Sequence, residues 1–164
     1  FAQMHFHWGS ESSLGSEHTI DGVRYPLELH IISYKSSYGG LAEAISQPDG
    51  LANIAVLFEI TTESNAALTP LLNALMTIPD AGDYGEVKNP YPIRAFLPKD
   101  TRKFYRYEGS LTTPSCNEVV VWTIFDTTAK VSENQLRILR SMKTGTGVKL
   151  VNNFRPPQAL NNRK

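Results

Sequence analysis

The stretch Gln3-Met4-His5-Phe6-His7-Trp8 alternates polar and apolar side chains with a period of two residues. Successive side chains of a β-strand point to opposite faces of a sheet, so this pattern predicts a half-buried strand. The apolar side chains would pack into a core on one face. His5 and His7 would project together from the other face, where two imidazoles can approach a common point.

The composition indicates a folded, globular protein. The 164 residues contain 16 Lys and Arg against 16 Asp and Glu, which gives a formal net charge of zero and a pI near 7.1. Binding to nucleic acid or to an anionic membrane needs an excess of basic residues on one face, so this balance argues against both. Hydrophobic residues make up 41% of the chain, which is enough for a core. The longest apolar stretch, Val119–Phe125, is much shorter than the roughly 20 residues of a membrane-spanning helix.

Several runs of β-branched and aromatic residues predict strands, with Gly, Pro, Asn and Asp between them. The predicted strands are Met4–Trp8, Leu27–Tyr34, Ile54–Ile60, Val119–Phe125 and Gly147–Val151. Two helices are predicted, one over Ala66–Ile78 and one that begins at the capping box Ser132-Glu133-Asn134-Gln135. Because strands and helices do not alternate, the pattern favours a mainly β fold of the α+β class over a parallel doubly wound sheet.

A third histidine completes a pattern that is typical of a metal site. His30 lies in the predicted strand Leu27–Tyr34, and neighbouring strands in a sheet are about 4.8 Å apart. If this strand lies beside the first one, His5, His7 and His30 can hold one metal ion and leave a fourth position open. Catalytic zinc sites have this arrangement.

Polar neighbours support the metal-site interpretation. Gln3 shares the face of His5, and Glu28 shares the face of His30. Each can accept a hydrogen bond from the second ring nitrogen of its histidine, as groups around metal sites usually do. The alternative is that these are ordinary core or surface histidines, satisfied by polar neighbours. The third strand histidine and the two acceptors favour the metal site.

The segment Gly109-Ser110-Leu111-Thr112-Thr113-Pro114 precedes the most apolar predicted strand. A hydroxyl from this segment could orient a nucleophile at the metal, provided that a carboxylate accepts the hydroxyl's own hydrogen bond. Glu17 is a candidate for that carboxylate. Taken alone, the segment is more typical of a turn-rich loop than of a functional site.

Together these motifs resemble the α-class carbonic anhydrases, in the family's order and spacing from Phe1 to about Arg163. The matching segments are Gln3–Gly9, Gly15–Gly22, Glu28–His30, Gln47–Ala52, Gly109–Pro114 and Asn153–Gln158. The resemblance implies a largely antiparallel, twisted central β-sheet with short peripheral helices. It also implies a single carbonic anhydrase domain over residues 1–164, with its N-terminal part outside this sequence.

The resemblance implies a zinc enzyme that reversibly hydrates carbon dioxide to bicarbonate and a proton, by attack of zinc-bound hydroxide. The zinc ligands would be His5, His7 and His30. Their second ring nitrogens would be held by Gln3, Glu28 and the backbone carbonyl of Asn153. Besides the small-molecule substrate, sulfonamide-type inhibitors are expected to bind. The sequence leaves the oligomeric state open.

The same resemblance implies roles around the substrate. Thr112 would accept the hydrogen bond of the hydroxide and donate its own to Glu17, and Thr113 would line the polar side. The apolar wall that seats carbon dioxide would consist of Ile32, Leu111, Val120 and Trp122. Asn53 stands where the family commonly has valine, and its polar amide should weaken this wall and lower the turnover. His18, next to Glu17, would be a buried structural histidine.

Cys116 is the single cysteine of the chain and is either a buried thiol or half of a disulfide. Extracellular and membrane-anchored members of the family carry a cysteine here that is bonded to one near the N-terminus. The resemblance therefore favours an extracellular protein, or a membrane-anchored one that faces outside, over a cytoplasmic one.

The alternative function is a catalytically weak, carbonic-anhydrase-like binding or matrix module. Such modules typically replace at least one zinc histidine. This chain keeps His5, His7 and His30 together with Thr112 and Glu17, so the sequence favours the enzyme.

Overall fold

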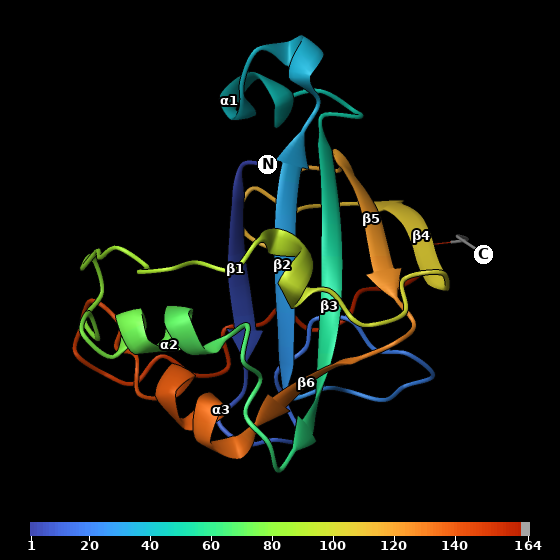
Figure 1. Cartoon of the computed structure of the whole chain (residues 1–164). Helices are drawn as coiled ribbons and strands as arrows, with labels where there is room; N and C mark the ends of the chain where they lie inside the picture. Colours follow the sequence, from blue (N-terminus) through green and yellow to red (C-terminus); the bar gives the residue numbers. More distant parts are fainter. Residues whose placement is uncertain (162–164) are drawn as a thin grey trace.

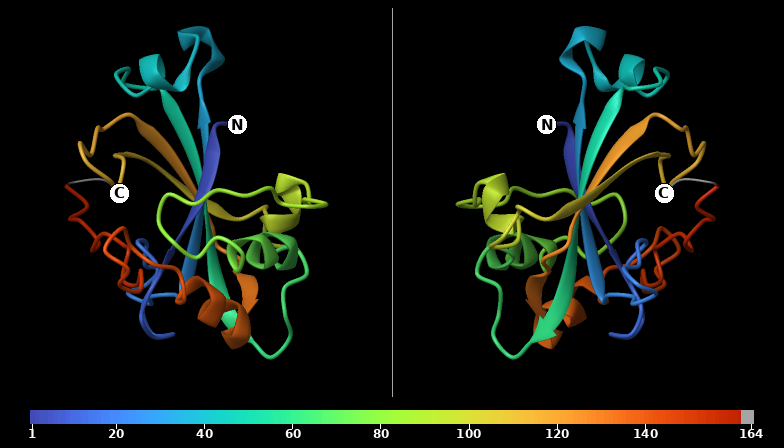
Figure 2. Two further views of the ribbon diagram at one scale, coloured as in Figure 1. Left: turned by 90° about the vertical axis from the view of Figure 1, so that its left-hand side faces the viewer. Right: turned by 90° about the vertical axis from the view of Figure 1, so that its right-hand side faces the viewer.

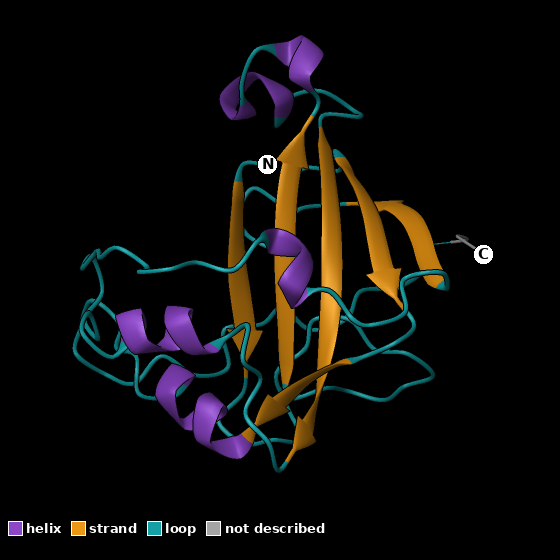
Figure 3. Cartoon of the chain, in the orientation of Figure 1, coloured by secondary structure: helices purple, strands orange, loops and turns teal. Residues whose placement is uncertain are grey.

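The computed structural model describes residues 1–161 and shows one twisted sheet with short helices around it (Figures 1 and 3). The strands are β1 (Gln3–Trp8), β2 (Leu27–Tyr34), β3 (Leu51–Thr61), β4 (Phe104–Gly109), β5 (Val120–Phe125) and β6 (Ala129–Ser132). The helices are α1 (Leu41–Ala44), α2 (Thr69–Leu75) and α3 (Glu133–Leu139), with 3₁₀ turns η1 (Ser36–Tyr38) and η2 (Ile93–Phe96). The predicted β-rich fold is confirmed.

The sheet has the strand order β1-β2-β3-β5-β4, and β6 pairs with the far end of β3. Three pairs of neighbouring strands run antiparallel: β1 with β2, β2 with β3, and β4 with β5. The long strand β3 is parallel to both β5 and β6. The sheet is therefore mixed, because the connection between β3 and β5 carries α2, η2 and β4 before it returns to the sheet.

The two faces of the sheet have different neighbours (Figure 2). One face packs against α2, α3 and η2, and the buried apolar side chains of β1, β2 and β3 that point this way form the larger core. The other face carries a smaller core around Trp122 and Leu57. On this second side lie the connection between β1 and β2 and the C-terminal segment (Figure 2).

Side chains on the second face form rows across the sheet, because the register aligns residues of neighbouring strands. One row runs through His5, His30, Ala55 and Ile124. The adjacent row runs through Gln3, Ile32, Asn53 and Trp122. Residues predicted to act in a site therefore lie side by side on one surface of the sheet.

Some predicted elements differ from the structure. The strand predicted over Gly147–Val151 is wrong: the segment forms a turn, in which the Thr144 N–H donates to the Val148 carbonyl and Gly147 has a φ of +78°. Among residues 1–161, the only β-pairing of this segment is an isolated bridge between Lys143 and Lys149. Helix α2 is shorter than the predicted Ala66–Ile78, with Pro70 in its first turn. Strands β4 and β6 and helix α1 were not predicted.

No helix among residues 1–161 is both long and apolar enough to cross a bilayer.

The start of α3 follows the predicted capping box. The Ser132 hydroxyl accepts a hydrogen bond from the Gln135 N–H, and the Gln135 side chain accepts one from the Ser132 N–H. The same Gln135 side chain also bonds to the backbone of Asn65, so the cap ties α3 to the segment that leads into α2.

We predict that Ser132→Ala lowers the free energy of unfolding by about 1 kcal/mol, because the hydroxyl satisfies a helix N–H that would otherwise lack a partner. Urea unfolding followed by circular dichroism measures the change. Ser141→Ala is the matched control, since its exposed hydroxyl caps no helix start. Equal stability of the two variants would contradict the role of the cap.

Candidate metal centre

Strands β1 and β2 bring three histidines together. The register places His5 directly opposite His30, with His7 one row further along β1. Their ring centroids are 4.5–5.2 Å apart, and one ring nitrogen from each lies within 4.8 Å of the others. His7 and His30 are buried and His5 is half-buried. The three imidazoles thus surround one point at the second face of the sheet.

The second ring nitrogen of each histidine meets an acceptor. His5 Nδ1 lies 3.1 Å from Gln3 Oε1, and His7 Nδ1 lies 2.8 Å from the Asn153 carbonyl. His30 Nε2 lies 2.6 Å from Glu28 Oε1. Carbonyl and carboxylate oxygens accept hydrogen bonds, so each of these ring nitrogens carries the proton in the neutral imidazole.

The remaining nitrogens are then His5 Nε2, His7 Nε2 and His30 Nδ1, each with a lone pair. His7 Nε2 and His30 Nδ1 are only 3.1 Å apart. With no proton between them, these two lone pairs would repel each other, and a cation placed among the rings would relieve that repulsion. The donor set and its tautomers therefore fit a metal ion with three nitrogen ligands.

The local electrostatics keep the rings of His5 and His7 neutral. Burial and the neighbouring His30 and His7 lower the pKa of His5 to about 4. Burial and His30 also lower the pKa of His7. Both imidazoles are uncharged at neutral pH, which is the form that binds metals.

Glu28 is the most connected polar side chain of the site. Its side chain is fully buried, and Oε2 accepts hydrogen bonds from the backbone N–H groups of Glu17 and His18, each at 2.9 Å. Oε1 lies 2.6 Å from both His18 Nδ1 and His30 Nε2. Burial raises the pKa of Glu28, but His18 and His30 outweigh it and hold the pKa well below its usual range. The carboxylate is therefore ionised.

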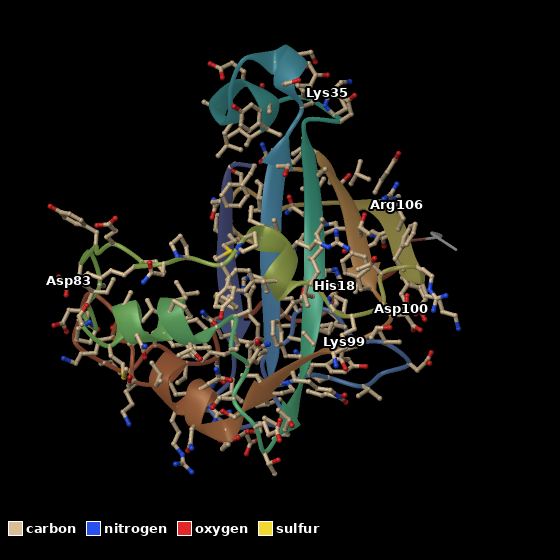
Figure 4. The ribbon with its side chains drawn as sticks, viewed as in Figure 1. His18, Lys35, Asp83, Lys99, Asp100 and Arg106 are labelled. Atoms are coloured by element: carbon tan, nitrogen blue, oxygen red, sulfur yellow. The ribbon has the colours of Figure 1, made fainter. Side chains whose placement is uncertain are left out.

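His18 belongs to this network and lies within the body of the molecule, whereas Lys35, Asp83 and Arg106 lie at its periphery (Figure 4). Burial lowers the pKa of His18, but the Glu28 carboxylate outweighs it and raises the pKa overall. His18 Nε2 lies 2.7 Å from the Tyr107 hydroxyl. His18, Glu28 and His30 also lie close enough to hold a metal, but their facing atoms are already joined by these hydrogen bonds.

Glu17 reaches the histidines from the connection between β1 and β2. Its Oε1 accepts a hydrogen bond of 2.7 Å from the Arg155 N–H. Its Oε2 is buried, has no hydrogen-bond partner and lies 3.4 Å from His7 Nε2. Thr112 and Glu17 line the same cavity of about 610 Å³. The expected hydrogen bond from Thr112 to Glu17 is not formed, so Oε2 keeps its capacity to accept one.

Most of the residues expected to seat the substrate lie on the same face of the sheet as the histidines. Four of them are buried on the second face of the sheet: Ile32, Asn53, Val120 and Trp122. Leu111 is half-buried against the smaller core of that face, and Thr113 is exposed. Sequence reasoning missed Tyr107, whose strand β4 was not predicted. It also missed the Arg155 N–H, although Arg155 lies within the matching segment Asn153–Gln158.

The family model for eukaryotic-type carbonic anhydrases matches residues 1–164, and the chain belongs to that family. This confirms the resemblance seen in the sequence motifs. A putative carbonic anhydrase 5 from Caenorhabditis elegans is 41% identical over an alignment 164 positions long, which covers 99% of this chain and 52% of the relative.

Other relatives give the same assignment. Carbonic anhydrase 6 from Bos taurus is 43% identical over 98% of this chain and 51% of its own length. Carbonic anhydrase 3 from Homo sapiens is 39% identical over 98% of this chain and 62% of its own length. The chain thus spans about half to three-fifths of the length of these relatives.

Cys116 is half-buried and unpaired in the structure. With a single cysteine, the chain forms no internal disulfide. The predicted pairing with a cysteine elsewhere, and the extracellular location, stay predictions.

We predict that Glu28→Gln destabilises the protein by about 3 kcal/mol, because an amide cannot accept from two backbone N–H groups and two imidazoles and leaves His18 without its buried counter-ion. Chemical denaturation measures the loss. Glu63→Gln is the control, since Glu63 is exposed and should change stability by less than about 0.5 kcal/mol. A Glu28→Gln variant as stable as this control would refute the assigned role.

Proposed function

We propose that this chain carries the catalytic centre of a carbonic anhydrase, which reversibly hydrates carbon dioxide to bicarbonate and a proton with zinc held by His5, His7 and His30. One observation carries the proposal. This member of the carbonic anhydrase family brings three imidazoles together. The protonated nitrogen of each ring donates a hydrogen bond to an acceptor, and the lone pairs of the other three nitrogens face one point.

The donor set fits zinc. Zinc–nitrogen bonds are about 2.0–2.1 Å long, so nitrogens in a tetrahedral site are about 3.3 Å apart, close to the 3.1 Å between His7 Nε2 and His30 Nδ1. Carbonic anhydrases are themselves the reference case in which bound zinc lowers the pKa of a coordinated water to about 7 and supplies a nucleophile at neutral pH.

The protein's own side chains and backbone hold the three imidazoles and orient the attacking nucleophile. Gln3, Glu28 and the Asn153 carbonyl fix the tautomer and the plane of each ring. Glu17 offers a buried acceptor oxygen to the hydroxyl of Thr112. With its proton directed at Glu17, that hydroxyl can only accept a hydrogen bond from the nucleophile, which turns the attacking lone pair toward the substrate.

The neighbouring apolar side chains suit a neutral substrate. Carbon dioxide carries no charge and donates no hydrogen bond, so contact with Ile32, Leu111, Val120 and Trp122 can hold it without desolvating a charged group. Thr113 would line the polar side. A binding module without activity is the alternative, but it would be expected to lack one of the three histidines.

We predict that His7→Ala abolishes zinc retention and carbon dioxide hydration, because two imidazoles bind zinc far more weakly than three. Zinc content by mass spectrometry and stopped-flow hydration with and without a sulfonamide are the measurements. His18→Gln is the matched control and should retain zinc at saturating concentration. Loss of zinc in His18→Gln alone would assign the metal to His18, Glu28 and His30 instead.

We predict that Thr112→Ala lowers kcat/KM for hydration by about 10²-fold, because the nucleophile loses its fixed orientation. Zinc content should stay at the wild-type value, since Thr112 supplies none of the three proposed ligands. Activity equal to that of the wild type would exclude Thr112 from the reaction.

A further inference from the structure

Arg24 contacts two segments that are far apart in the sequence. It is half-buried in the connection between β1 and β2. Its Nη1–H donates a hydrogen bond of 2.7 Å to the Ser16 carbonyl in the same connection. Its guanidinium lies over the Phe154 ring of the C-terminal segment, 5.1 Å from the ring centroid. Both segments lie on the second side of the sheet (Figure 2), and one side chain joins them.

The Ser16 carbonyl belongs to the same peptide unit as the Glu17 N–H. This N–H donates to the buried carboxylate of Glu28 at 2.9 Å. A peptide unit is planar, so hydrogen bonds at both of its ends fix its orientation and the direction in which Glu17 leaves the backbone. A cation at the carbonyl and an anion at the N–H also polarise the peptide in the same sense, so the two bonds strengthen each other. Arg24 and Glu28 therefore clamp the peptide unit that precedes the Glu17 side chain.

The second contact of the guanidinium is with a ring between two residues of the candidate site. Phe154 follows Asn153, whose carbonyl accepts the hydrogen bond of His7 Nδ1 at 2.8 Å. It precedes Arg155, whose N–H donates to Glu17 Oε1 at 2.7 Å. A cation over an aromatic face is attracted by the negative charge of the π system. The guanidinium therefore holds the ring whose flanking backbone reaches both the proposed ligand and the proposed acceptor.

We propose that Arg24 is a positioning residue for Glu17, an inference that rests on the function proposed above. The Glu17 carboxylate is placed by its own backbone and by the Arg155 N–H, and Arg24 holds the segment on each side of it. A guanidinium suits this role, because its edge donates hydrogen bonds while its flat face stacks on a ring. Arg24 acts through Glu17, whose Oε2 is the proposed acceptor for the hydroxyl of Thr112.

Hydrogen exchange of single backbone amides tests the positioning independently of activity. In Arg24→Met, the amides of Glu17 and Arg155 should exchange about 3- to 10-fold faster than in the wild type, the range for one lost hydrogen bond. Methionine keeps an apolar stem but has neither the charge nor the donor. The matched control is Arg137→Met, since Arg137 is exposed on α3 and donates to the Asn134 side chain. The control should leave both amides unchanged.

Stopped-flow kinetics of the zinc-loaded protein tests the path to the reaction. Arg24→Met should lower kcat/KM for carbon dioxide hydration by about 3- to 10-fold, since Glu17 is misplaced but keeps its bond to Glu28. Zinc content should not change. In the Thr112→Ala background, the same substitution should cost less than about 2-fold, because the hydroxyl that Glu17 orients is already absent. A general loss of structure would lower kcat/KM equally in both backgrounds.

Two results overturn the inference: unchanged exchange of the Glu17 and Arg155 amides in Arg24→Met, or an equal loss of kcat/KM with and without the Thr112 hydroxyl. If Arg24→Met does not fold, Arg24→Gln takes its place under the same criteria. If the two amides exchange faster but the wild type does not hydrate carbon dioxide, Arg24 still positions Glu17 and the proposed function falls.

Discussion

The antiparallel register between β1 and β2 is the constraint on which the candidate site depends. It sets His5 opposite His30 and His7 opposite Glu28, so three candidate metal ligands and the carboxylate that holds one of them occupy adjacent rows. Because side chains alternate along a strand, a slip by one residue would send His30 and Glu28 to the face covered by α2 and α3. The fully buried Leu27 and Leu29 on that face oppose such a slip.

Glu28 joins the stability of the fold to the chemistry of the site. Its ionised carboxylate is buried, which is tolerated because two backbone N–H groups and two imidazoles satisfy it. The backbone groups belong to Glu17 and His18, so the carboxylate that orients His30 also orders the segment that carries Glu17. The orientation of a metal ligand and the position of the proposed hydrogen-bond acceptor therefore depend on one group.

Buried polar groups without partners gather beside the histidines. Among the described residues, two buried side-chain atoms lack a hydrogen bond, Glu17 Oε2 and Asn53 Oδ1. The first lies near His7, and the second lies in the row next to His30. Each is an acceptor, and Glu17 also lines the cavity of about 610 Å³ that contains Thr112. Because buried acceptors are normally satisfied, these two oxygens set the surroundings of the histidines apart from the rest of the described core.

Local signals in the sequence determined the faces of β1 and β2 and the start of α3, because alternation and the capping box act over a few residues. Strand β4 left no such signal, since most of its side chains are exposed at the edge of the sheet, and Gly147–Val151 carried a strand-like pattern without a partner strand. Only the tertiary structure decided the parallel pairing of β3 with β5 and β6, and the unpartnered state of Asn53 Oδ1. It also brought the Asn153 carbonyl to His7 across 146 residues, because contacts between distant segments leave no periodic trace in the chain.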